Sequence, residues 1–350
     1  MTKIKIGNKL IGKGTPCFII AEAGVNHNGN INLAKRLIDV AKEAGVDAVK
    51  FQTFKAENLV TETAEVADYQ KKNIGKKETQ LKMLKKLELR EEDFFELRKY
   101  CNKKQIIFLS TPHTENAVDF LEPLVPAYKI GSGDLTNIPF LEKIAKKRKP
   151  IILSTGMANL KEVRGAVKTI KKTRNNKIIL LHCTVSYPCP LEEVNLRAIQ
   201  TLKKEFNLLV GYSDHTLGIL VPIMAVTLGA RVIEKHFTLD KNLPGPDHKA
   251  SIGPEELKKM VMAIRNAEKV LGSSIKKPTK SEEKIKKVGR KSIVAKVDIP
   301  KGTKIIQDML IIKRPGTGIE PRHINMIVGR KTKKDIKSNE LISFKKLISK

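Results

Sequence analysis

Eight short apolar segments, each seven or eight residues long, recur along the first 240 residues of the chain. Between them lie segments with apolar residues at helical spacing, as in 32–45 and 160–172. Buried strands that alternate with helices indicate parallel strands, and eight such units close a (β/α)8 barrel. The predicted strands span 17–24, 48–54, 106–112, 127–133, 150–156, 177–184, 208–215 and 231–238.

An open, doubly wound α/β sheet is the alternative to this α/β barrel. We favour the barrel because no GxGxxG turn follows the first segment, and because polar groups follow every segment instead of gathering at one switch point. Residues 3–12 predict a hairpin before the first barrel strand, and residues 55–104 form the longest insertion.

The residue pattern changes after the predicted helix 254–272. A polar, lysine-rich stretch there leads into short strand-like segments separated by turns. We therefore expect a barrel domain over 1–275, a linker over 276–288 and a small β-rich domain over 289–350.

Composition limits the function classes more than it selects one. The chain of 350 residues is 41% hydrophobic and has no apolar run of about 18 residues, so we expect a cytoplasmic protein with reduced thiols. The net charge of +30 is spread along the chain, and there is no tryptophan for stacking on bases. These features favour a lysine-rich solvated surface over a nucleic-acid interface, and they leave room for an anionic substrate.

Ionisable and hydroxyl residues end the predicted strands, at the face where a (β/α)8 barrel carries its active site. Alternation along a strand puts Glu234 and His236 on one side and Lys235 at the helix-facing rim. The full set is Glu22, Lys50, Gln52, Ser110, Thr111, Lys129, Ser132, Ser154, Thr155, His182, Thr184, Ser213, Asp214, His215, Glu234, Lys235 and His236. Any one of them could be a capping group or a satisfied core residue, but together they indicate a site.

Two kinds of chemistry follow from these residues. His215 and His236 end neighbouring strands and could share a divalent ion with open positions, although they could also be two ordinary histidines. Lys50 and Lys129, with hydroxyl groups around them, suit a phosphorylated carboxylate. Glu22 could be a general base or a charge partner, and Glu234 could orient a water or pair with Lys50.

Eight motifs in this order resemble the sialic acid synthases, that is, the N-acetylneuraminate synthase family with the legionaminic acid synthases. They cover nearly the whole chain together with the tail VDIPKGTKI and KRPGTGI, and they read IAEAGVNHNG, VKFQTF, KIGSGD, ILSTGM, LHCTVSYPCP, GYSDHTLG, EKHFTLD and PGPDHKAS. The resemblance implies a TIM barrel followed by an antifreeze-like (SAF) domain in a domain-swapped homodimer.

The same resemblance implies a reaction and a set of roles. Phosphoenolpyruvate would condense with N-acetylmannosamine, or a related acylated amino sugar, giving N-acetylneuraminate or a related nonulosonic acid plus phosphate, with Mn2+ or else Mg2+ or Co2+. Glu22 and Asp134 match catalytic positions, and His215 and His236 match the metal ligands. The phosphoenolpyruvate site would comprise Lys50, Thr111, Lys129, Ser132, Ser154 and Ser213, and the sugar site Gln52, Tyr187, Asp247 and the partner subunit's Arg314.

Three positions depart from the family pattern. Asp134 stands for a glutamate, Val185 for an asparagine, and His113 for an apolar residue. The last two positions are expected near the sugar and therefore bear on which sugar is used. The alternatives are an N,N'-diacetyllegionaminate synthase, condensation with a phosphosugar, and a carbohydrate-binding SAF protein without activity.

Overall fold

The structure, a computed structural model, describes residues 3–74 and 78–348, so residues 75–77 of the predicted insertion lie outside it. The chain divides into two compact units, one ending at Gly272 and the other beginning at Ser273.

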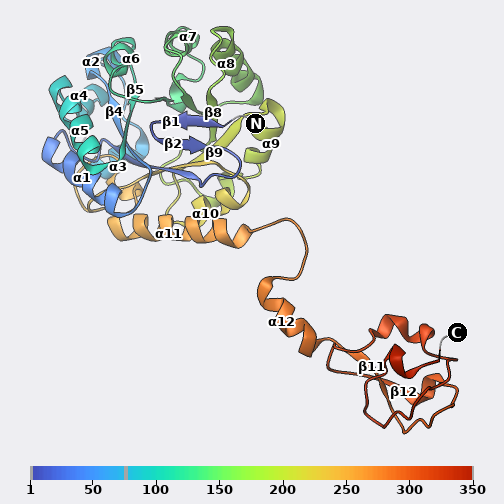
Figure 1. Cartoon of the computed structure of the whole chain (residues 1–350). Coiled ribbons are helices and arrows are strands. Elements are labelled where there is room, and N and C mark those ends of the chain that lie inside the picture. The colour runs from blue at the N-terminus through green and yellow to red at the C-terminus, as the bar shows by residue number, and fades with distance from the viewer. Residues whose placement is uncertain (1–2, 75–77, 349–350) are drawn as a thin grey trace. The chain divides into compact units, whose positions relative to one another are not determined.

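Eight parallel strands form the sheet of the first unit, in the order β5-β4-β3-β10-β9-β8-β7-β6 (Figure 1). Strands consecutive in the chain are neighbours, the first and last barrel strands pair with each other, and β5 lies against β6. This near-closed arrangement confirms the predicted barrel over the doubly wound sheet. The strands are β3 (Phe18–Gly24), β4 (Ala48–Thr53), β5 (Ile107–Pro112), β6 (Tyr128–Ile130), β7 (Ile151–Ser154), β8 (Ile178–His182), β9 (Leu209–Asp214) and β10 (Val232–His236).

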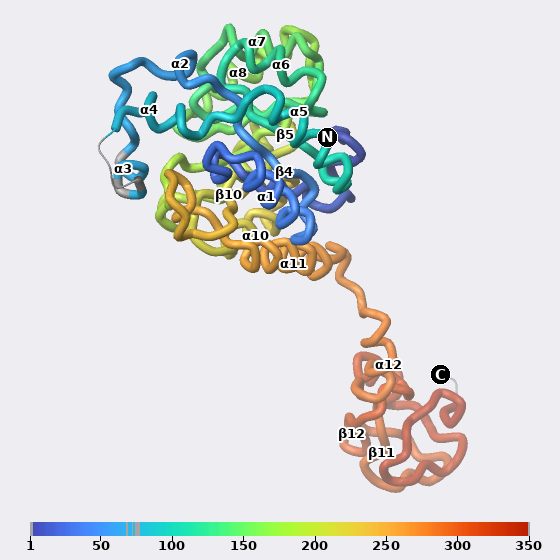
Figure 2. Tube along the Cα trace, turned by 90° about the vertical axis from the view of Figure 1, so that its left-hand side faces the viewer, coloured from blue at the N-terminus to red at the C-terminus, as the bar shows by residue number. Residues whose placement is uncertain are grey.

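Each barrel strand is followed by at least one helix, so the first unit contains eight βα repeats. The insertion after β4 adds three short helices, which lie together beside the barrel in Figure 2. The helices of this unit are α1 (Ile31–Glu43), α2 (Ala56–Leu59), α3 (Asp68–Ile74), α4 (Gln80–Lys85), α5 (Glu91–Lys104), α6 (Glu115–Leu121), α7 (Ile138–Lys146), α8 (Leu160–Lys172), α9 (Ala198–Phe206), α10 (Leu220–Thr227) and α11 (Pro254–Leu271).

Alternate residues of the strands belong to two separate hydrophobic cores. Ile19, Val49 and Tyr212 join the larger core between the sheet and the helices. Ile20, Ala48 and their equivalents on the other strands form a second core inside the barrel. Because side chains alternate between the faces of a strand, each inward series can continue from apolar residues into the polar residues at the strand end.

A hairpin of β1 (Ile4–Ile6) and β2 (Lys9–Ile11) precedes the barrel, as the sequence predicts. Its buried isoleucines belong to the inner core together with Phe18, the first residue of β3. The hairpin therefore packs on the N-terminal end of the barrel and leaves the opposite end for the polar residues.

The second unit has a small core of its own, built mostly from isoleucine. Two antiparallel strands, β11 (Ser292–Ala295) and β12 (Leu310–Lys313), are its regular sheet, and isolated bridges and short 3-10 turns complete it. The segment predicted as a linker contains most of α12 (Lys280–Gly289), which begins at Thr279 with a capping box.

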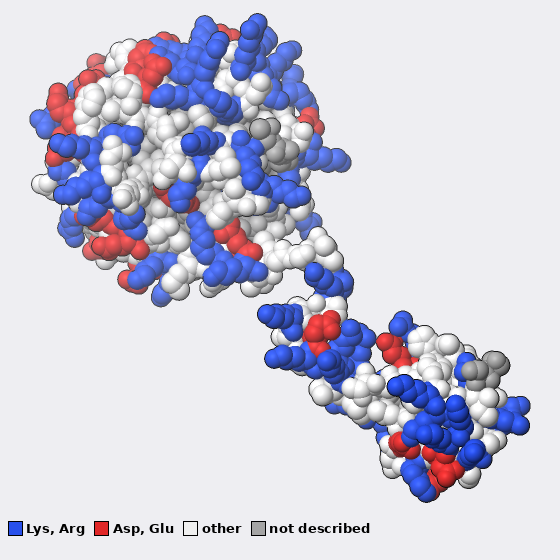
Figure 3. Space-filling model, viewed as in Figure 1, with Lys and Arg blue, Asp and Glu red and all other residues white. Residues whose placement is uncertain are grey.

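The surface of each unit reflects the excess of basic over acidic residues in the sequence (Figure 3). Figure 3 shows lysine and arginine side chains scattered over the visible face of each unit, with acidic residues between them. Among the described residues, no helix combines the length and apolarity needed to cross a membrane.

Gly211 of β9 provides a test of the barrel's inner packing. A Cβ atom at this position would lie 2.3 Å from the carbonyl oxygen of Val232 on β10 and 2.6 Å from a methyl group of Leu181. We expect Gly211→Ala to lower the free energy of unfolding by roughly 1–3 kcal/mol, because neither backbone can move without breaking the ladder. Urea unfolding followed by circular dichroism measures this change.

Gly165→Ala is the matched control, because Gly165 lies exposed in α8 with open space around its would-be Cβ. The control should gain about 0.5–1 kcal/mol from helix propensity. An unchanged unfolding midpoint for Gly211→Ala would contradict the packing described for β9 and β10.

Candidate active site

The inward side chains at the C-terminal ends of the strands form a buried charge cluster. Lys50 Nζ lies 2.6 Å from Glu22 Oε2 and 3.7 Å from Glu234 Oε2. Lys129 Nζ lies 3.3 Å from the other oxygen of Glu234. Each of the four side chains is at most 5% exposed. We call these four residues the charge quartet, in which two carboxylates balance two ammonium groups.

Hydroxyl and amide groups add hydrogen bonds to the quartet, while within the described part of the chain Glu22 Oε2 and Glu234 Oε2 have only their ion pairs with Lys50. Lys50 Nζ donates to Thr111 Oγ1 at 2.9 Å, and Ser213 Oγ donates to Glu234 Oε1 at 3.0 Å. Gln52 Nε2 donates to Glu22 Oε1 at 3.2 Å. These contacts join strands β4, β5, β9 and β10 to the carboxylate of β3.

The two carboxylates of the quartet differ in acidity. Burial raises the pKa of Glu22 to about 7, although the Lys50 ammonium group acts in the opposite direction. Burial also disfavours the ionised form of Glu234, but the ammonium groups of Lys129 and Lys50 outweigh it and lower the pKa. Glu234 therefore remains an anion that holds both lysines, whereas Glu22 can exchange a proton near neutral pH.

The loop after β6 and the loop after β7 meet beside the quartet. Ser132 Oγ accepts a hydrogen bond from the backbone N–H of Gly156 at 3.1 Å and lies 3.2 Å from Cys183 Sγ. Ser154 is buried at the inward-facing end of β7. Of the two predicted hydroxyl groups, Ser132 thus follows the strand of Lys129 and Ser154 ends the adjacent strand.

His215 and His236 lie on adjacent strand ends, with their ring centroids 5.7 Å apart. His215 Nδ1 lies 2.6 Å from the carbonyl oxygen of Thr184, which can only accept, so Nδ1 carries the proton and Nε2 keeps a lone pair. His236 Nδ1 is buried without a hydrogen-bond partner, 4.0 Å from Asp247 Oδ2. Burial lowers the pKa of both imidazoles, so both are neutral at pH 7.

A neutral imidazole is the form that binds a divalent metal, and a carbonyl on the far nitrogen, as at His215, is the usual support of such a ligand. His236 Nδ1 has no hydrogen-bond partner, whereas His215 Nε2 accepts from Tyr187 OH, so an ion at His215 would take the place of that hydrogen bond. The residues therefore fit the predicted ion. Within residues 3–74 and 78–348, no cluster of three or more histidine, cysteine or acidic side chains has metal-binding geometry. An ion held here by protein would rest on the two histidines, as the sequence predicts.

An aromatic residue, Tyr187, and an acidic residue, Asp247, lie beside the histidines. Tyr187 OH is 3.0 Å from His215 Nε2, and the two rings are 4.2 Å apart. Asp247 follows the Pro-Gly-Pro turn and is 7% exposed, and burial raises its pKa to about 6. Two of the predicted sugar residues, Tyr187 and Asp247, are thus brought to the histidine side of the site, and Gln52 to the quartet.

Two predicted site residues lie outside this cluster. Asp134 is on the 3-10 turn after β6, where Asn137 Nδ2 donates to its Oδ1 at 3.4 Å, and burial raises its pKa. Arg314 belongs to the second unit.

His113 and Val185, the positions expected near the sugar, are also placed by the structure. His113 has a buried Nε2 without a partner. Burial lowers its pKa to about 4, and the positive charges of Lys50 and Lys129 act in the same direction. Val185 packs its Cγ2 over Gly156.

Two positions depart from the expectations. Lys235 faces the helices, as strand alternation predicts, but instead of lying at the rim it is 1% exposed and forms an ion pair with Asp214 at 2.5 Å behind the barrel wall. Ser110 was expected near the lysines, but it faces outward and bonds Thr53 at 2.6 Å. In both cases strand alternation turns the side chain toward the helices, where a buried partner satisfies it.

Sequence reasoning missed Tyr69. It lies on α3 inside the longest insertion, within a polar stretch that has no strand or motif signal. Its ring stacks on Tyr187 with centroids 5.0 Å apart. Only the packing of α3 on the barrel mouth reveals it.

Comparisons with known proteins find matches to both units of the chain. Residues 37–276 match the NeuB family and residues 290–348 match the SAF domain. An N,N'-diacetyllegionaminic acid synthase of Legionella pneumophila is 55% identical over 328 residues, covering 92% of each chain. The human N-acetylneuraminate-9-phosphate synthase is 40% identical, covering 95% of this chain and 93% of its own.

A solved structure also aligns with this chain. The N-acetylneuraminic acid (sialic acid) synthetase of Leptospira borgpetersenii, crystallised with citrate, superposes with a TM-score of 0.72 at 38% identity. The alignment covers 81% of this chain and 95% of that one.

The quartet makes Glu234 a sensitive position for stability. Glu234→Ala would leave two buried ammonium groups facing one carboxylate, and we expect it to cost roughly 3–5 kcal/mol of unfolding free energy. Glu234→Gln keeps the shape and the Ser213 contact, so it isolates the charge. Denaturant unfolding at pH 7 gives both values.

Glu205→Ala is the control, because it breaks the exposed Arg164–Glu205 pair, whose side chains are 58% and 37% exposed. Exposed pairs contribute less than about 1 kcal/mol. Equal losses for Glu234→Ala and Glu205→Ala would show that the quartet is not a balanced buried network.

Proposed function

We propose that this chain, which belongs to the NeuB family and carries a SAF domain, condenses phosphoenolpyruvate with an open-chain acylated amino sugar. The products would be a nonulosonic acid and phosphate. Family membership rests on the match of residues 37–276 and on relatives of up to 55% identity over 92% of the chain. The observation that carries the proposal is the buried lysine pair of the quartet next to two neutral imidazoles on adjacent strand ends.

The proposed reaction forms one carbon–carbon bond. The C3 carbon of phosphoenolpyruvate attacks the sugar aldehyde, whose oxygen gains a proton and becomes a hydroxyl group. Water then adds at C2 and loses a proton, and the C2–O bond to phosphate breaks to leave a 2-keto acid. The protein must hold an anionic nucleophile, orient the aldehyde and move protons at two positions.

The quartet side of the site suits phosphoenolpyruvate. Lys50 and Lys129 would bind its phosphate and carboxylate, with the hydroxyl groups of Thr111, Ser132, Ser154 and Ser213 as donors. Glu22 would hold or return a proton, because its pKa is close to neutrality. His113 has a buried Nε2 without a hydrogen-bond partner, and the charges of Lys50 and Lys129 act on it, so it bears on this half of the site.

The histidine side suits the sugar. Tyr187 and Asp247 would orient the acylated chain, with Gln52 between the two halves. His215 and His236 would hold a divalent ion, proposed as Mn2+ with Mg2+ or Co2+ as alternatives, which supplies a Lewis acid for the aldehyde oxygen. Asp134 lies on the 3-10 turn after β6, outside the cluster. Its proposed catalytic role requires that substrate binding bring this turn toward the quartet.

Sequence identity favours one sugar over the other. The relatives at 55% and 51% identity are both N,N'-diacetyllegionaminic acid synthases, whereas the human N-acetylneuraminate-9-phosphate synthase is 40% identical. We therefore propose the 6-deoxy diacetamido sugar as the preferred substrate. N-acetylmannosamine, named first from the sequence, becomes the second candidate.

We also propose the domain-swapped homodimer, in which the SAF domain of one chain brings Arg314 to the sugar of the other. Guanidinium groups make directed hydrogen bonds to acyl oxygens, so Arg314 suits this role. The domain boundaries of the sequence, 1–275 and 289–350, remain our proposal for the folding units. The cytoplasmic location remains a prediction.

A product assay tests the reaction and the sugar together. With phosphoenolpyruvate and Mn2+, we expect faster release of phosphate and of a 2-keto acid from the 6-deoxy diacetamido sugar than from N-acetylmannosamine, because relatives of that specificity are more similar. Mass spectrometry identifies the product. The 6-phosphate of N-acetylmannosamine is the third substrate in the same assay.

The outcomes separate the alternatives. Turnover of the phosphorylated sugar alone would replace our proposal by phosphosugar condensation. No turnover with any of the three, together with polysaccharide binding by the second unit, would favour the carbohydrate-binding SAF protein.

Complementation tests the metal ligands and the dimer. His236→Ala should lose Mn2+ binding in calorimetry, Arg314→Ala should keep it, and each should be inactive alone. In a heterodimer of the two variants, one site combines an intact His236 with the partner's intact arginine. We expect it to regain roughly half of the wild-type rate, since one of two symmetric sites is complete.

Differently tagged chains allow the heterodimer to be purified, and circular dichroism checks that both variants fold. An inactive heterodimer would contradict the swapped arrangement. Unchanged Mn2+ binding by His236→Ala would contradict the metal assignment.

A further inference from the structure

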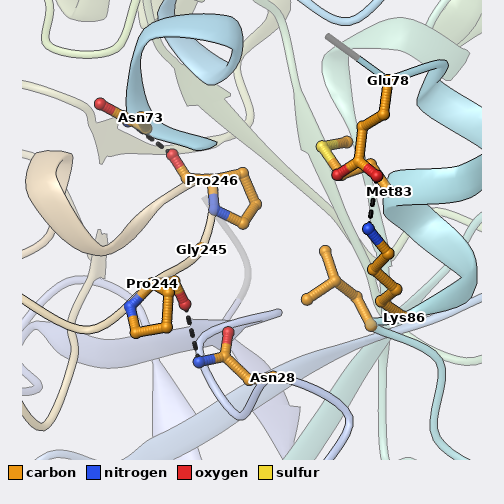
Figure 4. Close-up of a pocket in the computed structure, with 9 residues that line it drawn as sticks. Asn28, Asn73, Glu78, Met83, Lys86, Pro244, Gly245 and Pro246 are labelled. Atoms are coloured by element: carbon orange, nitrogen blue, oxygen red, sulfur yellow. Dashed lines mark hydrogen bonds and ion pairs between the residues drawn. The ribbon is translucent and has the colours of Figure 1, made fainter. Parts of the chain in front are cut away.

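Helix α3 touches the sugar side of the barrel mouth through two of its residues. Tyr69 stacks its ring on Tyr187 at 5.0 Å with an interplanar angle of 22°, and its hydroxyl lies 3.5 Å from Asp247 Oδ1. One helical turn later, Asn73 Nδ2 donates to the carbonyl oxygen of Pro246 at 2.7 Å (Figure 4). The insertion thus contacts two of the residues that the proposed function assigns to the sugar, Tyr187 and Asp247.

These contacts hold the turn that carries Asp247 from the side of the insertion, whereas Ser251 Oγ donates to the carbonyl oxygen of Asp247 at 2.7 Å from the chain that follows. A cavity of about 320 Å3 lies against the turn, lined in part by Met83, Leu87 and Gly245 (Figure 4). Close packing therefore does not hold the turn on that side. Hydrogen bonds do, from Asn73 to Pro246 and from Asn28 Nδ2 to the carbonyl oxygen of Pro244 at 2.8 Å.

Tyr187 is held in a similar way. Its ring contacts Tyr69 and His215, with centroid distances of 5.0 and 4.2 Å, and meets His236 edge-on at 5.6 Å. Without the Tyr69 ring, Tyr187 would lose one of its three ring neighbours and the one that stacks on it. The phosphoenolpyruvate side lacks such a contact, because among the described residues Tyr69 makes no hydrogen bond or ring contact with Lys50, Thr111 or Lys129.

We propose that Tyr69 is a positioning residue for the sugar, which fixes Asp247 by its hydroxyl and Tyr187 by its ring, and that α3 thereby contributes to sugar selection. This inference rests on the proposed function, because it uses the same site. It assigns to the insertion a task that the barrel strands do not supply. It also predicts different effects on the two substrates, because Tyr69 contacts only the sugar half of the site.

Two substitutions divide the role into its parts. Tyr69→Phe keeps the stacked ring and removes the hydroxyl, so we expect the KM for the sugar to rise about threefold, the scale of one hydrogen bond. Tyr69→Leu also removes the ring, and we expect a rise of roughly tenfold or more. The KM for phosphoenolpyruvate should stay within about twofold in both variants, since its ligands are untouched.

Asn73→Ala provides an independent route to the same effect. It releases the turn without altering Tyr69, so the KM for the sugar should rise while that for phosphoenolpyruvate does not. Tyr100→Phe is the matched control, because Tyr100 on α5 donates a similar hydrogen bond, 3.0 Å to Asp39, away from the site. The control should leave both KM values unchanged.

Calorimetric titration of the sugar into the protein, with Mn2+ present and phosphoenolpyruvate left out, measures sugar binding without turnover. A wild-type chain that binds sugar but gives no product contradicts the proposed reaction and still tests Tyr69 through the sugar Kd. Equal changes in both KM values, or an unchanged sugar Kd and KM in Tyr69→Phe and Tyr69→Leu, would overturn the inference. If Tyr69→Leu does not fold, as judged by circular dichroism, Tyr69→Phe and Asn73→Ala decide.

Discussion

The balance of charge inside the barrel is the constraint on which the rest of the site depends. A buried ion without a partner is costly, so the two lysines of the quartet can lie among apolar strands only because Glu22 and Glu234 lie beside them. These four residues come from four different strands. A register slip of one residue on any of these strands would turn its charge outward and leave the others unbalanced. The quartet therefore restricts the strand register as strictly as the hydrophobic core does.

A second buried pair reinforces this register from the other face. Lys235 and Asp214 lie on the same two strands as Glu234 and Ser213, but they point toward the helices, where Lys235 also donates to the carbonyl oxygen of Thr216 at 2.7 Å. Strands β9 and β10 thus carry functional groups on one face and an ion pair on the other. Neither set of contacts can shift without breaking the other. The two histidines at the ends of these strands are therefore held at a fixed distance and orientation.

The sequence predicted those features that follow from periodicity. Eight apolar segments and their alternation indicated the barrel, the inward Glu234 and His236, and the hairpin beneath. Periodicity could not show that Lys235 is buried, because a side chain that points outward from a strand can end in solvent or under a helix. Nor could it find Tyr69, whose importance comes from the docking of α3 on the barrel mouth. Contacts made by insertions depend on tertiary packing, which leaves no period in the chain.

The unequal acidities in the quartet connect its structure with its proposed chemistry. Glu234 is shared by two lysines and stays ionised, whereas Glu22 has one lysine and a raised pKa. An anionic substrate that reaches Lys50 competes with Glu22 for the same ammonium group. This competition favours protonation of Glu22, because the carboxylate then loses part of its counter-charge. Substrate binding would thus supply a proton at the end of β3, beside the position where the proposed reaction has to move one.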